Sequence, residues 1–274
     1  MLKKIAFLLI IFTIILSCTP SNSYPQGWVV TSPELAEIIV KLGATENIVG
    51  VTKECDFPSD LQNKTIVGNF GKVDIEKVIE LNPAKVFLTK LEQEELAITL
   101  EKLDIPTFSA YPNSIETLFH TIEEVGKEIN RTEQAQELVK NLKTQLSQLQ
   151  KEQHSAQSRV YIEIYGEPLM SVSDDSYVGQ LLRQAGGKNI FPSLPREYSR
   201  VSPEKVIVAD PQIIIVTYPG ISKAQIAARK GWENISAVQN NRIYTVQDID
   251  PDIILRASPR FVQGIKKLQE IIYE

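Results

Sequence analysis

The chain has 274 residues, enough for one large domain or two small ones, and its 43% hydrophobic and 23% charged residues are ordinary for a globular protein. A formal net charge of −5 at pH 7, without a basic stripe, argues against a nucleic-acid-binding protein. The two cysteines and two histidines lack the spacing of metal ligands, so a zinc site built from protein side chains alone is not expected.

The first strong signal lies at the N-terminus. Lys3 and Lys4 precede an apolar run of 11 residues (5–15), which is too short for a comfortable membrane span and is typical of a signal peptide. The run leads into Leu16-Ser17-Cys18, which resembles the lipobox of bacterial lipoproteins, whose cysteine thiol receives a diacylglycerol. We therefore expect residues 1–18 to be a lipoprotein signal peptide that ends at the lipidated Cys18. An ordinary signal peptide with an incidental cysteine is the alternative.

The segment that follows Cys18 is small and polar, and residues 19–27 are expected to form a flexible tether. Lipidation of Cys18 would leave Cys55 as the one remaining cysteine, so the mature protein would form no internal disulfide. These features predict a protein of the cell envelope that is extracytoplasmic and lipid-anchored to a membrane, either periplasmic or at the cell surface.

Short apolar strands alternate with helices over residues 28–130, which predicts parallel βαβ units and a first lobe. Helix signals include Ser32-Pro33 and Asp74 at starts, and Asn82-Pro83 at an end. The expected strands are 28–30, 48–51, 67–71, 86–88 and 106–109, and the expected helices are 33–42, 75–81, 91–103 and 114–129.

A long helix is expected next, from about Thr132 to Gln153, because no Gly or Pro interrupts this segment. It would span roughly 30 Å, about the width of a small domain. We assign residues 131–156 to a linking helix between two lobes; an ordinary surface helix is the alternative. Its apolar residues have the spacing of one helical face: Ala135, Leu138, Val139, Leu142, Leu146 and Leu149.

Residues 157–274 repeat the alternation and form a second lobe. The sequence therefore predicts an α/β fold of two similar parallel-sheet lobes joined by one long backbone helix, with a ligand cleft between the lobes. The expected strands are 160–165, 189–191, 213–216 and 243–246, and the expected helices are 177–185, 203–209, 221–229 and 259–272.

An internal repeat supports two lobes of similar topology. Glu204 follows Glu76 by 128 residues, and Pro211 follows Pro83 by the same 128. In the simplest interpretation, the two glutamates compensate the helix dipole in a first turn. They also form a matched pair of exposed charges, one per lobe, that suits a partner with two-fold symmetry. We favour both roles together.

Sheets of this kind bind ligands at the carboxyl ends of their strands. In the first lobe the loops at these ends carry Glu54, Asp56, Phe57, Phe70, Thr89 and Tyr111. In the second lobe, residues 247–260 place acids and arginines between a strand and the last helix, at the end that faces the expected cleft.

The motifs of common enzymes are absent from the sequence. There is no Gly-x-Ser-x-Gly elbow, no phosphate-binding loop and no His-Glu-x-x-His. Cys55 has no histidine nearby in sequence to activate it, and His120 and His154 are expected to be structural or solvated. We therefore predict that the chain is not an enzyme but a solute-binding protein without a cofactor or metal site.

The stretch Arg256-Ala257-Ser258-Pro259-Arg260 resembles the vitamin B12 (cobalamin) binding proteins of ABC importers, within the larger class that carries siderophores and haem. The segments 201–206 and 185–191 support this resemblance, which covers nearly the whole chain after the signal peptide. It implies that aromatic rings cover the corrin faces and that polar groups lie at the rim. Phe57, Phe70 and Tyr198 fall at the matching aromatic positions, with Asp252 and Arg256 at the rim.

The resemblance has two departures that bear on the ligand. Glu54 and Thr89 stand where the cobalamin proteins tend to have aromatic residues, which leaves room for another corrinoid or a siderophore. The family also docks to its permease through one glutamate per lobe, and Glu76 and Glu204 match those positions. The expected partners are therefore a small-molecule ligand, an ABC permease dimer with its ATPase, and a membrane through the lipid anchor; the protein itself is expected to be a monomer.

Three alternatives stay open. The same fold would carry a ferric siderophore if Arg256 paired with the anionic chelate. Haem is the third candidate ligand. It ranks below the other two because a Tyr or His would have to bind its iron, and neither histidine lies in an expected cleft loop. From a different class, a lipid-anchored structural or adhesion protein would need neither a cleft nor docking acids. For a binding protein, the rigid linking helix predicts small motion between the lobes.

Overall fold

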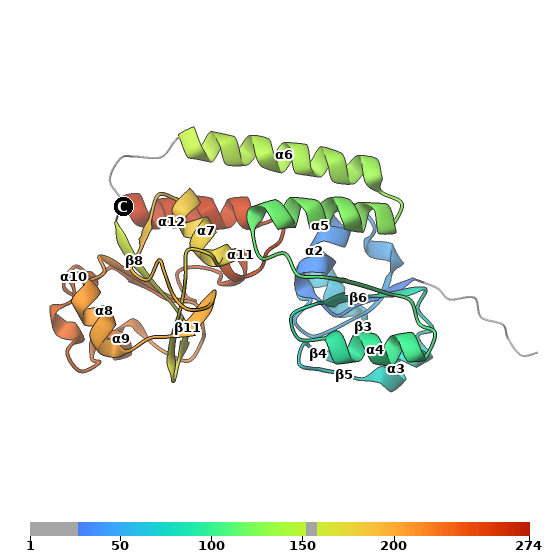
Figure 1. Ribbon diagram of the computed structural model, residues 1–274, viewed down its shortest axis with the longest axis horizontal. Coiled ribbons are helices and arrows are strands. Elements are labelled where there is room, and N and C mark those ends of the chain that lie inside the picture. The colour runs from blue at the N-terminus through green and yellow to red at the C-terminus, as the bar shows by residue number, and fades with distance from the viewer. Residues whose placement is uncertain (1–26, 152–157) are drawn as a thin grey trace, which may run out of the picture.

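The computed structural model describes residues 27–151 and 158–274. Two groups of strands and helices lie side by side, and three helices run along the top of both in Figure 1. Each group corresponds to one of the expected lobes. The expected signal peptide, most of the tether and His154 lie outside the described residues, within which no helix has the length and apolar character needed to cross a bilayer.

The first lobe contains a five-stranded parallel sheet in the order β3-β2-β1-β6-β7. The expected strand at 67–71 is instead a short antiparallel hairpin of β4 and β5, which lies outside that sheet. The strands are β1 Trp28–Val30, β2 Ile48–Val51, β3 Thr65–Ile66, β4 Gly68–Asn69, β5 Lys72–Val73, β6 Lys85–Thr89 and β7 Thr107–Ala110. The helices are α2 Pro33–Lys41, α3 Ile75–Glu80, α4 Glu94–Lys102 and α5 Ile115–Glu128, with 3₁₀ turns at Thr45–Asn47 and Ser59–Asn63.

The second lobe has a six-stranded sheet in the order β11-β9-β8-β12-β13, with β10 paired to β8. Strands β8, β10, β12 and β13 are parallel, whereas β9 and β11 add an antiparallel extension that the sequence analysis did not predict. The strands are β8 Arg159–Gly166, β9 Leu169–Val172, β10 Lys188–Asn189, β11 Tyr198–Arg200, β12 Ile213–Val216 and β13 Ile243–Tyr244. The helices are α7 Tyr177–Gln184, α8 Pro203–Ala209, α9 Lys223–Ala227, α10 Ser236–Gln239, α11 Asp252–Leu255 and α12 Phe261–Tyr273, with a 3₁₀ turn at Trp232–Asn234.

The long helix α6 spans Thr132–Lys151 and connects the two lobes in the chain. Its predicted apolar face is confirmed: Ala135, Val139 and Leu142 are buried, and Leu138, Leu146 and Leu149 are partly buried against the same core. It packs on α5 and α12, which lie nearly end to end beneath it in Figure 1. The helix therefore bridges the lobes along their shared upper side.

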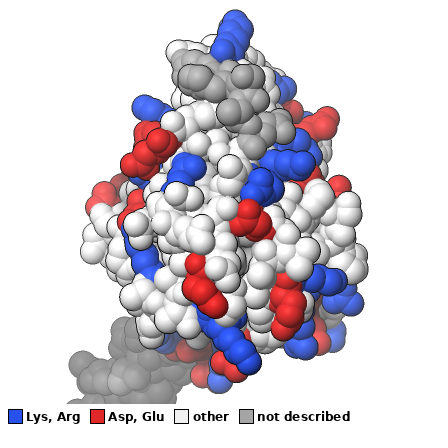
Figure 2. Space-filling model, turned by 90° about the vertical axis from the view of Figure 1, so that its left-hand side faces the viewer, with Lys and Arg blue, Asp and Glu red and all other residues white. Residues whose placement is uncertain are grey.

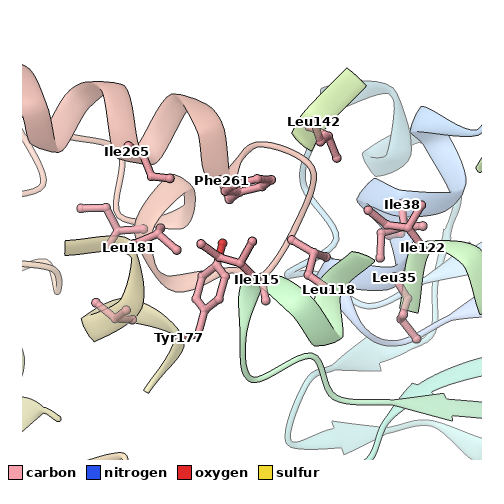
Figure 3. Packing of buried hydrophobic residues seen from close by; sticks show 14 of the residues in the cluster. Leu35, Ile38, Ile115, Leu118, Ile122, Leu142, Tyr177, Leu181, Phe261 and Ile265 are labelled. Atoms are coloured by element: carbon pink, nitrogen blue, oxygen red, sulfur yellow. The ribbon is translucent and has the colours of Figure 1, made fainter. Parts of the chain in front are cut away.

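One hydrophobic core runs from the first lobe into the second (Figure 3). Where the lobes meet, Ile115 and Leu118 of α5 lie opposite Tyr177 of α7 and Phe261 of α12. The rings of Phe119 and Phe261 form an edge-to-face pair with centroids 5.9 Å apart. Moving the lobes apart would expose this apolar surface to water, at a cost of about 25 cal/mol per Å², so the packing supports small motion between them.

The internal repeat is visible in the helix starts. Asp74 caps α3 by accepting from the backbone N–H of Lys77, and Ser202 caps α8 by accepting from that of Lys205. Each helix then leads through a proline to a buried strand, β6 or β12.

On the surface at the second-lobe end of the molecule, acidic and basic side chains are interspersed without a patch of one sign (Figure 2).

Candidate functional site

A buried threonine stands at the carboxyl end of five parallel strands. Thr31, Thr52 and Thr89 occupy this position in the first lobe, and Thr217 and Thr245 in the second; each is at most 4% exposed. Two of their hydroxyls bind nearby loops: Thr31 donates to the Gln93 side chain at 2.6 Å, and Thr245 to the Gln247 side chain at 2.6 Å. Thr217 instead donates to the carbonyl of Glu163, on the neighbouring strand β8, at 3.3 Å. The loops that carry the predicted site residues are thus tied to the ends of the sheets.

Three of the predicted site residues meet across the two lobes. The guanidinium of Arg256 lies with Nη1 2.7 Å from Oδ1 of Asp56, in the first lobe, and with Nη2 2.8 Å from Oδ2 of Asp252, in its own lobe. Its side chain is 12% exposed, whereas Asp56 is half exposed. The predicted rim of the site is therefore an ion-pair network rather than a set of free polar groups.

A second arginine and a glutamate complete this network, and sequence reasoning did not assign either to the site. Arg260 places Nε 2.8 Å and Nη2 2.6 Å from the two carboxylate oxygens of Glu37, on α2 of the first lobe. Ser258 donates to Glu37 at 2.6 Å, and Arg260 also pairs with Asp250 at 3.1 Å. We call the seven residues the cross-lobe cluster: Glu37, Asp56, Asp250, Asp252, Arg256, Ser258 and Arg260.

The ring of Phe57 lies on the outside of this cluster. The guanidinium carbon of Arg260 is 4.0 Å from the ring centroid, a cation–π contact. Phe57 is 42% exposed, so a large part of its ring remains available for a ligand.

Glu54, Phe70 and Thr89 form a separate group within the first lobe, joined by Gln93. The carboxylate of Glu54 accepts from the backbone N–H of Phe70 at 2.8 Å, and Gln93 donates to the Phe70 carbonyl at 3.0 Å and accepts from the Thr89 N–H at 3.2 Å. Phe70 and Gln93 line an open groove of about 290 Å³ with Lys72, Glu92 and Leu96. Thr89 is 4% exposed, so it supports the loop more than it lines a surface.

Tyr198 lies at a second contact between the lobes. Its phenol is hydrogen-bonded to that of Tyr111, which follows β7 of the first lobe. Burial raises the pKa of both tyrosines, so both phenols stay neutral at physiological pH. Beside them, Asn113 donates to the carboxylate of Glu197 at 3.1 Å.

The two glutamates expected to dock the permease are both exposed. Glu76 lies in the first turn of α3 and Glu204 in the first turn of α8. Hydrogen bonds from its own backbone N–H and from Ser202 lower the pKa of Glu204, so it is fully ionised at neutral pH. Both carboxylates are therefore accessible to a cationic partner.

Two side chains were considered for catalysis, His120 and Cys55, and Cys55 lies between the predicted site residues Glu54 and Asp56 in the chain. His120 stands on the exposed side of α5, 3.2 Å from Glu124, and Cys55 is buried, with burial raising the pKa of its thiol to about 12. In the part of the chain that the structure describes, no three His, Cys, Asp or Glu side chains are grouped so that they would hold a metal ion. The strand-end loops of the two lobes can therefore contact a ligand through hydrogen bonds, aromatic stacking and charged groups.

Comparison with known proteins agrees with this arrangement. The model of a family described as periplasmic binding protein matches residues 29–255. The chain is 26% identical to an uncharacterized ABC transporter substrate-binding lipoprotein of Bacillus subtilis, over 91% of this chain and 80% of that one. It is 22% identical to a vitamin B12-binding protein of Vibrio parahaemolyticus, over 98% of this chain and 97% of that one.

Among solved structures, one from Staphylococcus epidermidis superimposes with a TM-score of 0.80 at 26% identity, covering 91% of this chain and 99% of that chain. That protein is described as a possible iron-binding, periplasmic solute-binding protein. The fold is thus shared with a protein described as possibly iron-binding, whereas a relative by sequence is described as B12-binding. The descriptions of relatives therefore do not fix the ligand of this chain.

Proposed function

The chain belongs to the periplasmic binding protein family, and from this premise we propose that it is the lipid-anchored, extracytoplasmic substrate-binding component of an ABC importer and that its ligand is cobalamin or a related corrinoid. A B12-binding relative that matches nearly the full length supports the ligand, and a relative described as a substrate-binding lipoprotein supports the anchor at Cys18. Capture of the ligand involves no covalent chemistry.

The charge balance of the cross-lobe cluster carries this proposal. Four carboxylates, from Glu37, Asp56, Asp250 and Asp252, surround two guanidiniums, from Arg256 and Arg260. Both arginines are already paired, so an anionic ligand would have to displace a carboxylate and would meet excess negative charge. A corrinoid presents neutral peripheral amides, which can hydrogen-bond to these carboxylates without that penalty.

The aromatic residues support a flat, largely apolar macrocycle. Phe57 presents an exposed ring beside the cluster, Phe70 lines the first-lobe groove, and Tyr198 contributes a ring from the second lobe. Ring faces of this kind stack on planar π systems and bury large apolar areas. Rim hydrogen bonds from Asp252 and Arg256 would then fix the orientation of the ligand.

A ferric siderophore is the alternative ligand of the same fold. It is favoured by the iron-binding description of the S. epidermidis protein and by Glu54 and Thr89, which replace aromatic residues of the cobalamin proteins. Haem ranks lower: Tyr111 and Tyr198 are kept as neutral phenols by burial, which disfavours a tyrosinate ligand to iron. A lipid-anchored structural protein would bind none of these ligands.

We further propose that the protein acts as a monomer that docks on an ABC permease dimer through Glu76 and Glu204, one from each lobe. The shared core and α6 oppose wide opening of the free protein. Docking to the permease, rather than spontaneous hinge motion, would then open the site and release the ligand.

The test is a calorimetric titration of the full chain, purified in detergent, with cyanocobalamin. We expect a Kd of about 1 μM or below, weakened by Phe70→Ala and by Tyr198→Ala. Trp28→Ala is the control, because this partly buried ring lies at the start of β1 and packs on Phe87, at the opposite end of the strand from Thr31. Absence of binding to cyanocobalamin, with binding of a ferric siderophore, would replace the corrinoid by the alternative ligand.

A further inference from the structure

Glu37 is a charged residue in the middle of α2, and its side chain is only 3% exposed. A buried carboxylate is unfavourable unless it is paired and fully hydrogen-bonded. Here the groups that satisfy it come from the other lobe: two nitrogens of Arg260, the hydroxyl of Ser258 and, at 3.5 Å, Nη1 of Arg256. Glu37 therefore anchors a second-lobe segment directly to a first-lobe helix.

The anchored segment carries the proposed rim of the ligand site. Ser258 and Arg260 follow α11, which contains Asp252 and leads into Arg256. Arg260 in turn holds the ring of Phe57 by its cation–π contact. The position of three proposed ligand contacts thus depends on groups that Glu37 fixes.

A second cross-lobe ion pair in this region, between Asp56 and Arg256, is more exposed. Asp56, which pairs with Arg256, has a side chain that is 50% exposed, whereas Arg260 and Glu37 are 5% and 3% exposed. Ion pairs in contact with water are weak and are screened by salt, whereas a buried two-point pair is strongly directional. The Glu37–Arg260 pair is accordingly the stronger constraint on the geometry of the rim.

We propose that Glu37 is a positioning residue of the ligand site: its carboxylate holds Arg260 and Ser258 so that Arg256, Asp252 and Phe57 keep a fixed arrangement across the two lobes. The proposal rests on the proposed function in placing the ligand at this rim. Glu37 does not touch the ligand; it acts through the residues that do.

The second lobe supplies a matched control. Glu163 is 0% exposed and is paired at two points with Arg229, at 2.6 and 2.7 Å, with the Tyr218 hydroxyl as a third partner. Glu163 thus resembles Glu37 in its burial and in its two-point pairing with an arginine. Because Glu163, Arg229 and Tyr218 all belong to the second lobe, however, this carboxylate does not connect the two lobes. Glu163→Gln therefore reports the purely structural cost of removing a buried, paired charge.

The first experiment is amide hydrogen exchange on the full chain in detergent, without ligand. In Glu37→Gln we expect exchange in residues 249–260 and 54–57 to be about tenfold faster or more, whereas Glu163→Gln leaves these segments near wild type. Unchanged exchange in both segments in Glu37→Gln would overturn the proposal. Should Glu37→Gln fail to fold, Ser258→Ala, which removes one bond to the same carboxylate, takes its place with the same expectation.

The second experiment is titration with cyanocobalamin. Glu37→Gln is expected to weaken binding by about tenfold, mainly through faster dissociation, with Glu163→Gln within about twofold of wild type. Equal effects of Glu37→Gln and Glu163→Gln would reduce Glu37 to a structural role. If the wild-type protein does not bind cyanocobalamin, the corrinoid proposal fails, while the exchange result still decides the positioning role.

Discussion

Asn82, after α3, and Asp210, after α8, have the same left-handed backbone conformation, with φ of 43° and 44°. Each immediately precedes a proline. Asn and Asp tolerate this region better than other residues with a Cβ, and the following proline disfavours continuation of the helix. The two positions are 128 residues apart, as are Glu76 and Glu204. The equivalent helix exits place both strands β6 and β12 in the same relation to their lobes.

We expect the Asp210 carboxylate to make the stability of the folded protein sensitive to acid. The backbone N–H and the hydroxyl of Ser236, each 2.8 Å away, lower its pKa, with a further contribution from Arg159. A lowered pKa in the folded state gives stability that is present above the unfolded-chain pKa of about 3.9 and is lost as pH falls through the folded pKa. We therefore expect Asp210→Asn to lower Tm at neutral pH, and the difference from wild type to shrink below about pH 4, in thermal melts followed by circular dichroism.

Asp252 serves as the control because its pKa is shifted in the opposite direction. Burial raises this pKa, against the attraction of Arg256, so Asp252 binds a proton more readily in the folded than in the unfolded protein. Its contribution to stability increases as pH falls through the raised pKa. Asp252→Asn is thus expected not to lower Tm at neutral pH. A decrease in Tm as large as that of Asp210→Asn would contradict these shifts.

Removing Arg256 should destabilise the protein more than removing an exposed cation. Arg256→Ala leaves Asp56 and Asp252 without their common partner in a partly buried site, and we expect a loss of about 2 kcal/mol in the free energy of unfolding. Lys223→Ala breaks a pair with Asp248 at 2.7 Å whose side chains are 49% and 28% exposed, and should cost less than about 1 kcal/mol. Urea unfolding of both variants measures the difference; equal losses would mean that the cross-lobe pair is as weak as a surface pair.

Much of the fold was predictable because its signals are local. The apolar face of α6, the caps Asp74 and Ser202 and the buried run 213–216 are encoded within a few residues of one another. The antiparallel strands β9 and β11 were missed because they have only four and three residues. Strand β9 pairs with β8 across a tight hairpin and β11 pairs with β9, so both depend on their pairing partners more than on a local pattern.

The site was predictable in part. Asp56, Asp252 and Arg256 follow strands or lie near the last helix, and they do meet, as loops at the carboxyl ends of strands should. Glu37 was not found because a lone glutamate on an amphipathic helix normally faces water. Its burial depends on Arg260, 223 residues further along the chain, and sequence periodicity carries no information about a pairing of that range.

The two cysteines give a direct test of lipid anchoring. Cys55 is buried, and the raised pKa of its thiol, about 12, leaves it un-ionised at neutral pH, so we expect no reaction with a disulfide reagent in the native protein. If Cys18 carries a thioether-linked diacylglycerol, protein purified from membranes and unfolded in guanidinium chloride should show one reactive thiol of the two cysteines in the sequence. Two reactive thiols would exclude the lipid. The control is the Cys18→Ser variant, which should show one reactive thiol and should no longer be found in the membrane fraction.

The exposed glutamates Glu76 and Glu204 should govern transport without affecting capture. Replacing both with glutamine removes one docking charge from each lobe but leaves the cross-lobe cluster intact. We expect ligand uptake, in proteoliposomes containing the permease and ATPase of the same organism, to fall by about tenfold, with cyanocobalamin affinity unchanged within about twofold. Each single variant should lie between the wild type and the double variant, because each lobe contributes its own contact.

The matched control is Glu133→Gln/Glu137→Gln, which removes two exposed charges from α6, on the side of the molecule away from α3 and α8 (Figure 1). It gives the same change in net charge, so equal loss of uptake in both double variants would indicate a general electrostatic effect on encounter rather than docking at these two positions. Uptake that is unchanged in Glu76→Gln/Glu204→Gln would refute the docking role. Loss of uptake confined to that variant, with ligand binding retained, would separate docking on the permease from capture of the ligand.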